Sequence, residues 1–143
     1  MFEEIIEKLK ECPAARYEVA EDRVRVLQGA REGFDVMIEQ VWENHFTVFF
    51  DGWHEEFFDY AKAVACFLMG LSDRCRLKTQ AKGDSRFQWT LEYLDGDQWR
   101  ERSSTQRYIH QFWKPSVTSY LQNDLLHESS QDLPVAVEES QSH

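Results

Sequence analysis

The sequence predicts an α+β fold in which one antiparallel meander sheet of about six to seven strands carries three helices, packed mainly on one face. Three observations predict it. The stretch Phe34–Phe57 alternates apolar side chains with period two around a tight turn at Glu43-Asn44, which is typical of a β-hairpin. The stretch Phe87–Tyr93 alternates in the same way and leads into a second hairpin signal, Asp95-Gly96. Apolar stripes with helical spacing occur at three other places.

The predicted order of elements is α-β-β-β-β-α-β-β-β-α. A helix from about Phe2 to Glu11 carries one apolar stripe, and Pro13 ends it because a proline disfavours helix in the residue before it. Two short strands follow, Arg16–Ala20 and Arg23–Gln28, and both alternate apolar with charged residues. The long hairpin supplies the next two strands, and its short turn implies antiparallel pairing.

A second helix is predicted from about Tyr60 to Leu71, with Asp59 as its cap and three alanines that favour helix. Strands are expected from Cys75, over Phe87–Tyr93 and over Gln98–Arg102, with a weaker strand at Arg107–Gln111. Pro115 suits the first turn of a third helix that runs to about Leu126.

Residues 1–126 are expected to form a single domain, and residues 127–143 a disordered acidic tail, because the tail has few apolar residues and no aromatic ones. No stretch is apolar enough over 18 residues to span a membrane, and the charged N-terminus does not look like a signal peptide. The three cysteines form no CxxC pair, which favours a reducing compartment. We therefore expect a cytoplasmic protein.

The net charge of −10 is uneven along the chain. Residues 1–60 carry a net charge of −9, residues 61–126 carry +3, and residues 127–143 carry −4. The acidic first half disfavours duplex nucleic acid as the main partner, since contacts to phosphate dominate that affinity. It favours a basic partner protein, although such a charge also serves solubility.

The segment Asp51–Glu56 is the first candidate site, because it concentrates carboxylates beside a histidine. Trp53, His54, Glu55 and Glu56 are its candidate binding residues. Its spacing matches no metal signature, since HExxH is absent, and we expect no metal and no cofactor. The alternative interpretation is the exit of the hairpin and the start of a helix, with acids near the positive end of the helix dipole.

Tryptophans and basic residues are the remaining candidates. Trp42 and Trp89 fit the inward faces of their strands, whereas Trp99 and Trp113, like Trp53, fall at strand ends or in loops and are candidate binding residues. Tryptophans of this kind can also line a cleft for an apolar ligand. Arg74, Arg76 and Lys78 alternate on one predicted strand, and Arg100 and Arg102 alternate on another. They could form a basic stripe that binds single-stranded nucleic acid, or a solvated face paired with Glu92 and Glu101.

No Gly-x-Ser-x-Gly elbow, P-loop or GxGxxG motif is present, which favours a non-enzymatic role. The leading hypothesis is a protein-binding module that uses its acidic surface, exposed aromatics and open sheet edges, with self-association as a homodimer included. The alternative is a small-molecule-binding or catalytic domain with an aromatic cleft near Asp51–Glu56. The element order, small size and acidic balance resemble those of type III secretion chaperones, which implies a homodimer that wraps an extended effector segment. Acidic α+β immunity proteins, which neutralise basic toxins, are similar in the same respects.

Overall fold

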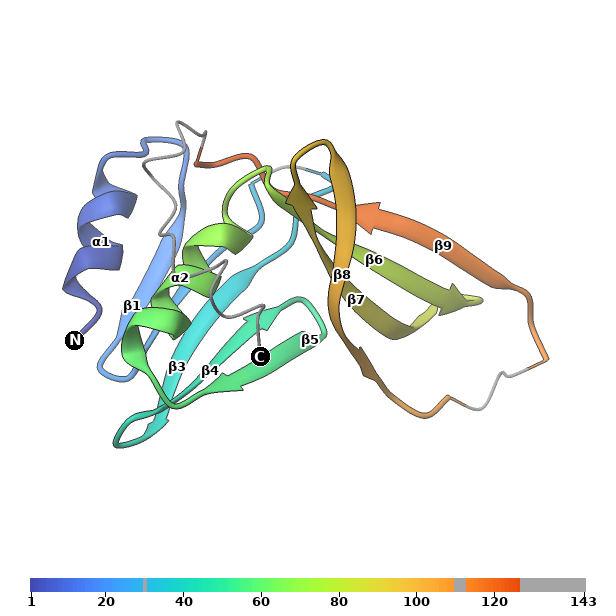
Figure 1. The fold of residues 1–143 in the computed structure, drawn as a ribbon, viewed down its shortest axis with the longest axis horizontal. Helices are drawn as coiled ribbons and strands as arrows, with labels where there is room; N and C mark the ends of the chain where they lie inside the picture. Colours follow the sequence, from blue (N-terminus) through green and yellow to red (C-terminus); the bar gives the residue numbers. More distant parts are fainter. Residues whose placement is uncertain (30, 110–112, 127–143) are drawn as a thin grey trace.

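The structure, a computed structural model, describes residues 1–29, 31–109 and 113–126. Within these ranges the chain forms two helices and two antiparallel sheets, of five and four strands. The predicted α+β class and the antiparallel pairing are therefore confirmed. The prediction of three helices on a single meander sheet is wrong, because the second half of the chain builds a sheet of its own (Figure 1).

The five-stranded sheet is a simple meander in which each strand pairs with the next one along the chain. Helix α1 (Glu3–Lys10) and helix α2 (Tyr60–Gly70) lie on the same face of this sheet (Figure 1). The side chains that alternate toward the helices are apolar, which is the pattern expected for a sheet with one buried face. The strands are β1 (Tyr17–Ala20), β2 (Arg23–Val26), β3 (Val36–Trp42), β4 (His45–Phe50) and β5 (Trp53–Phe57).

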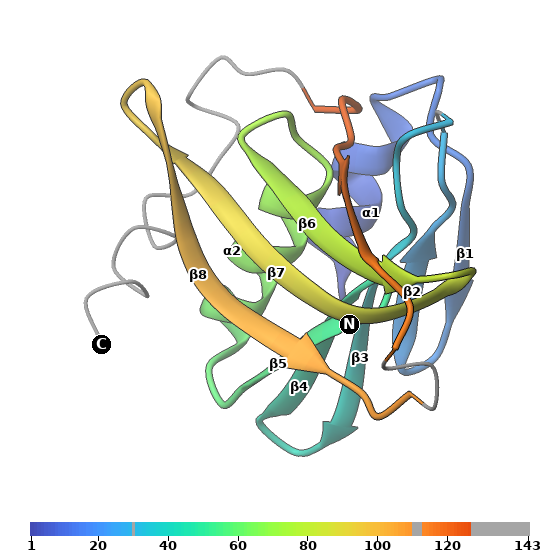
Figure 2. The same ribbon diagram turned by 90° about the vertical axis from the view of Figure 1, so that its right-hand side faces the viewer.

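The four-stranded sheet has the order β8-β7-β6-β9, so its last strand crosses over to pair with the first. This sheet is strongly twisted and lies beside the five-stranded sheet and helix α2 (Figure 2). The hairpin between β7 and β8 follows Asp95, which pairs with Gln98, and Gly96 in its turn adopts a positive φ of 68°, as the Asp95-Gly96 signal predicts. The strands are β6 (Cys75–Lys82), β7 (Ser85–Asp95), β8 (Gln98–Gln106) and β9 (Ser116–Leu121).

Strand β9 replaces the third helix predicted from Pro115 to Leu126. It pairs antiparallel with β6 from Leu77↔Leu121 to Lys82↔Ser116 without a break in register. Its sequence, SVTSYL, is rich in β-branched residues and serine, which lose more freedom in a helix than straight-chain residues do. The apolar spacing fits both periods, and pairing with β6 decides between them.

Two other boundaries differ from the prediction. Trp53–Phe57 is a strand, β5, and not the start of a helix, because it completes the five-stranded sheet beside β4. β8 extends to Gln106, four residues beyond the predicted end. In the weak strand predicted at Arg107–Gln111, residues 107–109 form no strand and residues 110–111 lie outside the described residues. The tail predicted for residues 127–143 also lies outside them.

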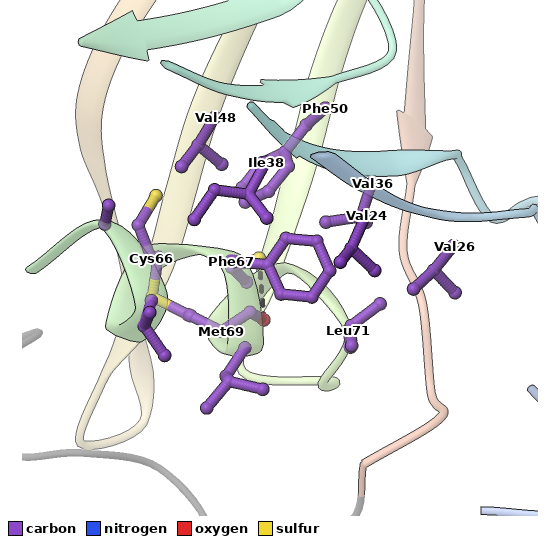
Figure 3. Close-up of a cluster of buried hydrophobic side chains, with 14 of the residues drawn as sticks. Val24, Val26, Val36, Ile38, Val48, Phe50, Cys66, Phe67, Met69 and Leu71 are labelled. Atoms are coloured by element: carbon purple, nitrogen blue, oxygen red, sulfur yellow. Dashed lines mark hydrogen bonds between the residues drawn. The ribbon is translucent and has the colours of Figure 1, made fainter. Parts of the chain in front are cut away.

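Helix α2 packs into the centre of the core (Figure 3). Asp59 caps it, since its carboxylate accepts a hydrogen bond from the backbone N–H of Ala61 at 2.9 Å. Buried side chains from the helix and both sheets form one contiguous core. At the end of the helix Gly70 lies against the ring of Phe50 so closely that a Cβ atom would collide with it. No helix of the described residues is long and apolar enough to cross a membrane.

Candidate functional site

The segment Asp51–Glu56 lies where the two sheets meet. Asp51 and Gly52 form the turn between β4 and β5, and the remaining residues belong to β5. β5 is the last strand of the five-stranded sheet, and it lies against β7 and β8 of the other sheet. We call this contact between β5 and the β7–β8 hairpin the sheet junction. The hydrogen bonds of its polar side chains decide which of the candidate residues are available to bind a partner or ligand.

Glu55 is held inside the sheet junction by Arg102 of β8. The carboxylate of Glu55 accepts hydrogen bonds from Nε of Arg102 at 3.1 Å and from Nη2 at 2.8 Å. Only 9% of the Arg102 side chain is exposed. Burial acts to lower the pKa of this guanidinium, but the hydrogen bonds to Glu55 and the nearby negative charge outweigh it and raise the pKa. Arg102 therefore stays charged, and the pair is a nearly buried salt bridge.

Trp53 belongs to the same junction and is fully buried. Its indole Nε1 donates a hydrogen bond to Oγ of Ser103 at 3.0 Å, and Ser103 Oγ in turn lies 3.4 Å from Oε1 of Glu55. The ring stacks on Phe50 with 4.8 Å between ring centroids. A side chain with no exposed surface cannot contact a partner directly, so Trp53 is a core residue in this structure.

Asp51 and Gly52 fix the other end of the junction. The carboxylate of Asp51 accepts hydrogen bonds from Nε1 of Trp89 at 2.7 Å and from Nη1 of Arg86 at 2.9 Å. Trp89 is buried, as the sequence predicts. Its ring covers Gly52 so closely that a Cβ atom there would collide with it, which is why the turn contains a glycine.

His54 and Glu56 point away from Glu55, because neighbouring residues of a strand face opposite sides of the sheet. Glu56 binds Nε2 of His45 at 2.6 Å, and the backbone N–H of His54 donates to Oγ1 of Thr105 at 3.3 Å. The candidate carboxylates and His54 therefore do not converge on one point. Among the described residues, no three His, Cys, Asp or Glu side chains are placed to hold a metal ion.

Trp99 lies on the outer face of the four-stranded sheet, whereas Trp53 is buried in the sheet junction. The guanidinium of Arg76 is stacked between the rings of Trp99 and Tyr120, 4.3 Å from each ring centroid. Nε of Arg76 also donates to Glu92 at 2.6 Å. This pairing agrees with the solvated-face interpretation of the basic stripe, because Arg76 is engaged with its neighbours. Trp113, the last candidate, is exposed just before β9.

The sequence reasoning missed an exposed aromatic patch at the other end of the five-stranded sheet. Trp42 is 76% exposed, although alternation along β3 predicts that it faces inward. An irregularity in the pairing between Gln40 and Trp42 shifts the register and turns the ring outward. His45 is its partner across the hairpin, and the His45 ring stacks on Phe58 with 4.6 Å between centroids. Phe58 itself is 71% exposed.

We call Trp42, His45 and Phe58 the aromatic patch. The tip of the β3–β4 hairpin and the loop between β5 and α2 bring its members together. Three acids lie beside it: Glu43 follows Trp42 in the turn, Glu56 binds His45, and Asp59 follows Phe58. Phe58 carries no sequence signal for this exposure, because an apolar residue directly before a helix cap often packs against the first turn of the helix.

The cysteines offer no activated nucleophile in the core. Burial raises the pKa of Cys66 and of Cys75, so both thiols stay protonated at neutral pH. Cys12 differs in position, because it lines an open hollow of about 420 Å³ between the end of α1 and residues 124–126. Its Sγ lies 3.4 Å from the carbonyl oxygen of Leu125.

We expect iodoacetamide to modify native protein at Cys12 about 100-fold or more faster than at Cys66 and Cys75, since the buried thiols react only after local or global opening. Peptide mass spectrometry measures the three rates. A Cys12→Ser variant should take up almost no label until urea unfolds it. Rapid native labelling of Cys66 or Cys75 would contradict the burial described above.

The described residues thus contain two regions of different character. In the sheet junction the carboxylates of Asp51 and Glu55 are engaged with tryptophan, serine and arginine side chains. In the aromatic patch, large apolar rings lie exposed beside acids. No family model, no curated protein and no solved structure matches the chain.

Proposed function

We propose that this protein is a non-enzymatic protein-binding module, and that its aromatic patch contacts a basic partner protein. The observation that carries the proposal is the exposure of two large rings: Trp42, the cross-strand partner of His45, and Phe58, which stacks on the His45 ring. Exposed clusters of large apolar side chains mark interaction sites in soluble proteins. Tryptophan in particular is enriched among the residues that dominate binding energy.

The patch is also held in place before any partner binds. His45 is fixed on one side by the stacked ring of Phe58 and on another by Glu56 at 2.6 Å. Trp42 lies opposite it in a hairpin whose turn residue Asn44 adopts the left-handed conformation, with φ 57°. A surface that is ordered in advance loses less conformational entropy on binding. An ordered hairpin of this kind is therefore better suited to be a contact surface than a flexible loop is.

The charge around the patch favours a basic partner. Glu43, Glu56 and Asp59 border it, and residues 1–60 carry a net charge of −9. Complementary charge speeds association and selects among partners more than it adds affinity. A partner with lysine or arginine around an apolar centre would match both features. The chaperone-like and immunity-like roles, the homodimer and the cytoplasmic location remain predictions within this proposal.

The alternative, a ligand-binding or catalytic site near Asp51–Glu56, has less support. Asp51 and Glu55 hold the two sheets together, and their hydrogen bonds are made to side chains of the opposite sheet. Breaking these contacts to bind a substrate would cost the stability that they provide. The geometry therefore favours a structural role for this cluster and a binding role for the aromatic patch.

The test is a pull-down from native lysate with wild type and a Trp42→Ala/Phe58→Ala variant, quantified by mass spectrometry. We expect a stoichiometric basic partner with wild type and a loss of about 100-fold in affinity with the variant, since two interface anchors each contribute about 1–3 kcal/mol. Tyr108→Ala removes an equally exposed ring from the segment that follows β8 and serves as the control. Binding should also weaken as salt is raised, because the charges are exposed.

Two results would contradict the proposal. If a stoichiometric partner binds the double variant as tightly as wild type, the aromatic patch is not the contact surface. If wild type captures no protein at all, the protein-binding function itself fails. Circular dichroism and urea unfolding of the variant must match wild type, which is expected because both rings lie outside the core.

A further inference from the structure

Each sheet has two edge strands, of which one lies in the sheet junction and the other lies outside it. β5 and β8 are edge strands of their own sheets, but they lie against each other in the sheet junction. β1 and β9 are the other two edge strands. Within the described residues, each of them pairs with a strand on one side only. An unpaired edge presents backbone N–H and C=O groups that can pair with an added strand.

Within the part of the chain that the structure describes, β9 lacks the charge, proline and irregularity that usually protect an edge. Ser116–Leu121 contains no charged residue and no proline, and its pairing with β6 has no bulge. Every residue from Ser116 to Tyr120 is exposed, including Val117 at 57%. β1 differs, since it is only four residues long and carries Glu18 near its middle. Edge strands in soluble proteins are normally blunted by charge, proline or irregularity, so an unprotected edge indicates a binding site.

The charge beside β9 indicates what would bind there. On the outer face of the sheet, Lys78 lies opposite Tyr120 and Lys82 lies opposite Ser116. Both lysines lie one strand in from the edge, and Nζ of Lys82 lies 5.8 Å from the centroid of the Phe87 ring on β7. Their positive charges act on an added strand across β9, a separation comparable to the screening length of about 10 Å. Residues 61–126 as a whole carry a net charge of +3. An incoming strand with acidic residues on this face would therefore be favoured electrostatically.

The opposite face of β9 favours apolar residues at the alternate positions. Val117 pairs with Ala81 there, and Val117 is largely exposed. A strand added beside it could cover this side chain with an apolar one, because side chains of neighbouring strands on the same face pack together. The edge thus selects a segment in which acidic and apolar residues alternate.

We propose that β9 is a strand-addition site, and that its occupant is an extended acidic segment of a partner protein, which adds to the four-stranded sheet as a fifth strand. A second copy of this chain fits less well, because pairing β9 with β9 would place the lysines of two basic sheets beside each other. The site lies on a different sheet from the aromatic patch and does not depend on it. Either site can fail its test while the other passes.

The test uses a short fluorescent peptide of alternating valine and glutamate as the probe, with anisotropy as the measurement. We expect saturable binding to the full chain and slowed hydrogen exchange in the β9 amides. Two control peptides define the mode: one has lysine in place of glutamate, and one is N-methylated at alternate amides so that it cannot pair through its backbone. Neither control should bind appreciably.

Protein variants locate the site. Thr118→Glu places an acid on the exposed edge, and Lys78→Glu reverses a charge beside it; each should weaken binding of the peptide about tenfold. Lys10→Glu makes the same change in net charge as Lys78→Glu on helix α1 and should leave the affinity unchanged. Circular dichroism checks that the variants fold, which is expected for an exposed residue such as Thr118.

Three outcomes would overturn the proposal. The first is no binding of the acidic peptide to wild type at millimolar concentration. The second is equal binding of the N-methylated or lysine peptide, which would show that strand pairing or charge is not the basis of recognition. The third is a concentration-dependent dimer in light scattering that Thr118→Glu abolishes, because the edge would then belong to a second copy of the chain.

Discussion

Replacement of Trp53 by alanine is expected to lower the free energy of unfolding by about 4 kcal/mol, the range found when a large aromatic side chain is removed from a core. Trp53 is fully buried and stacks on Phe50. The variant would also leave Ser103 without the indole hydrogen bond that it now accepts. Urea unfolding followed by circular dichroism measures the change.

Trp42→Ala is the matched control, because it removes the same side chain from an exposed position on the same sheet. Its expected effect on stability is within about 0.5 kcal/mol. The two variants separate a buried tryptophan, which is expected to contribute to stability, from an exposed one, for which we propose a role in binding. Similar losses of stability in both variants would contradict the burial difference on which the aromatic patch rests.

Replacement of Arg102 by methionine is expected to cost about 3 kcal/mol, because it leaves the carboxylate of Glu55 without its charged partner in the sheet junction. The estimate lies at the low end for buried pairs, since Glu55 keeps 30% of its side chain exposed. Methionine retains most of the apolar stem of arginine, so the loss reports on charge and hydrogen bonding more than on packing. Urea unfolding again provides the measurement.

A double-mutant cycle makes the second prediction decisive. Glu55→Leu combined with Arg102→Met removes both charges, and we expect it to recover most of the stability lost in Arg102→Met. Such recovery would show that the junction contains a coupled ion pair. Losses that simply add, with the double variant less stable than either single one, would show that the two side chains act independently and that the junction is held by packing alone.

The local sequence was sufficient for elements whose signals agree with one another. Strands at the positions of β3, β4 and β7, the hairpin at Asp95-Gly96 and the Asp59 cap of helix α2 all appear as predicted. In each case periodicity and turn or cap chemistry favour the same structure, so tertiary contacts had no conflict to resolve. The antiparallel α+β class follows from these elements alone.

The sequence was insufficient where two periods fit the same residues. Ser116–Leu121 has apolar spacing compatible with helix, and only the pairing with β6, about 40 residues earlier, makes it a strand. Trp42 is a related case, since an irregular pair in β3 reverses the face that alternation assigns to it. No local sequence signal indicates that Ser116–Leu121 is a strand or that Trp42 faces outward.

The sequence by itself determined the α+β class, the antiparallel hairpins, the uneven charge and the residue types available for binding. Only the tertiary structure decided that Asp51 and Glu55 join two sheets, that Trp53 is buried, and that Trp42 lies exposed beside Phe58. The physical reason is that hairpins and caps depend on neighbours in the chain. The division into two sheets, and with it the burial of each candidate side chain, depends on pairing between strands far apart in sequence.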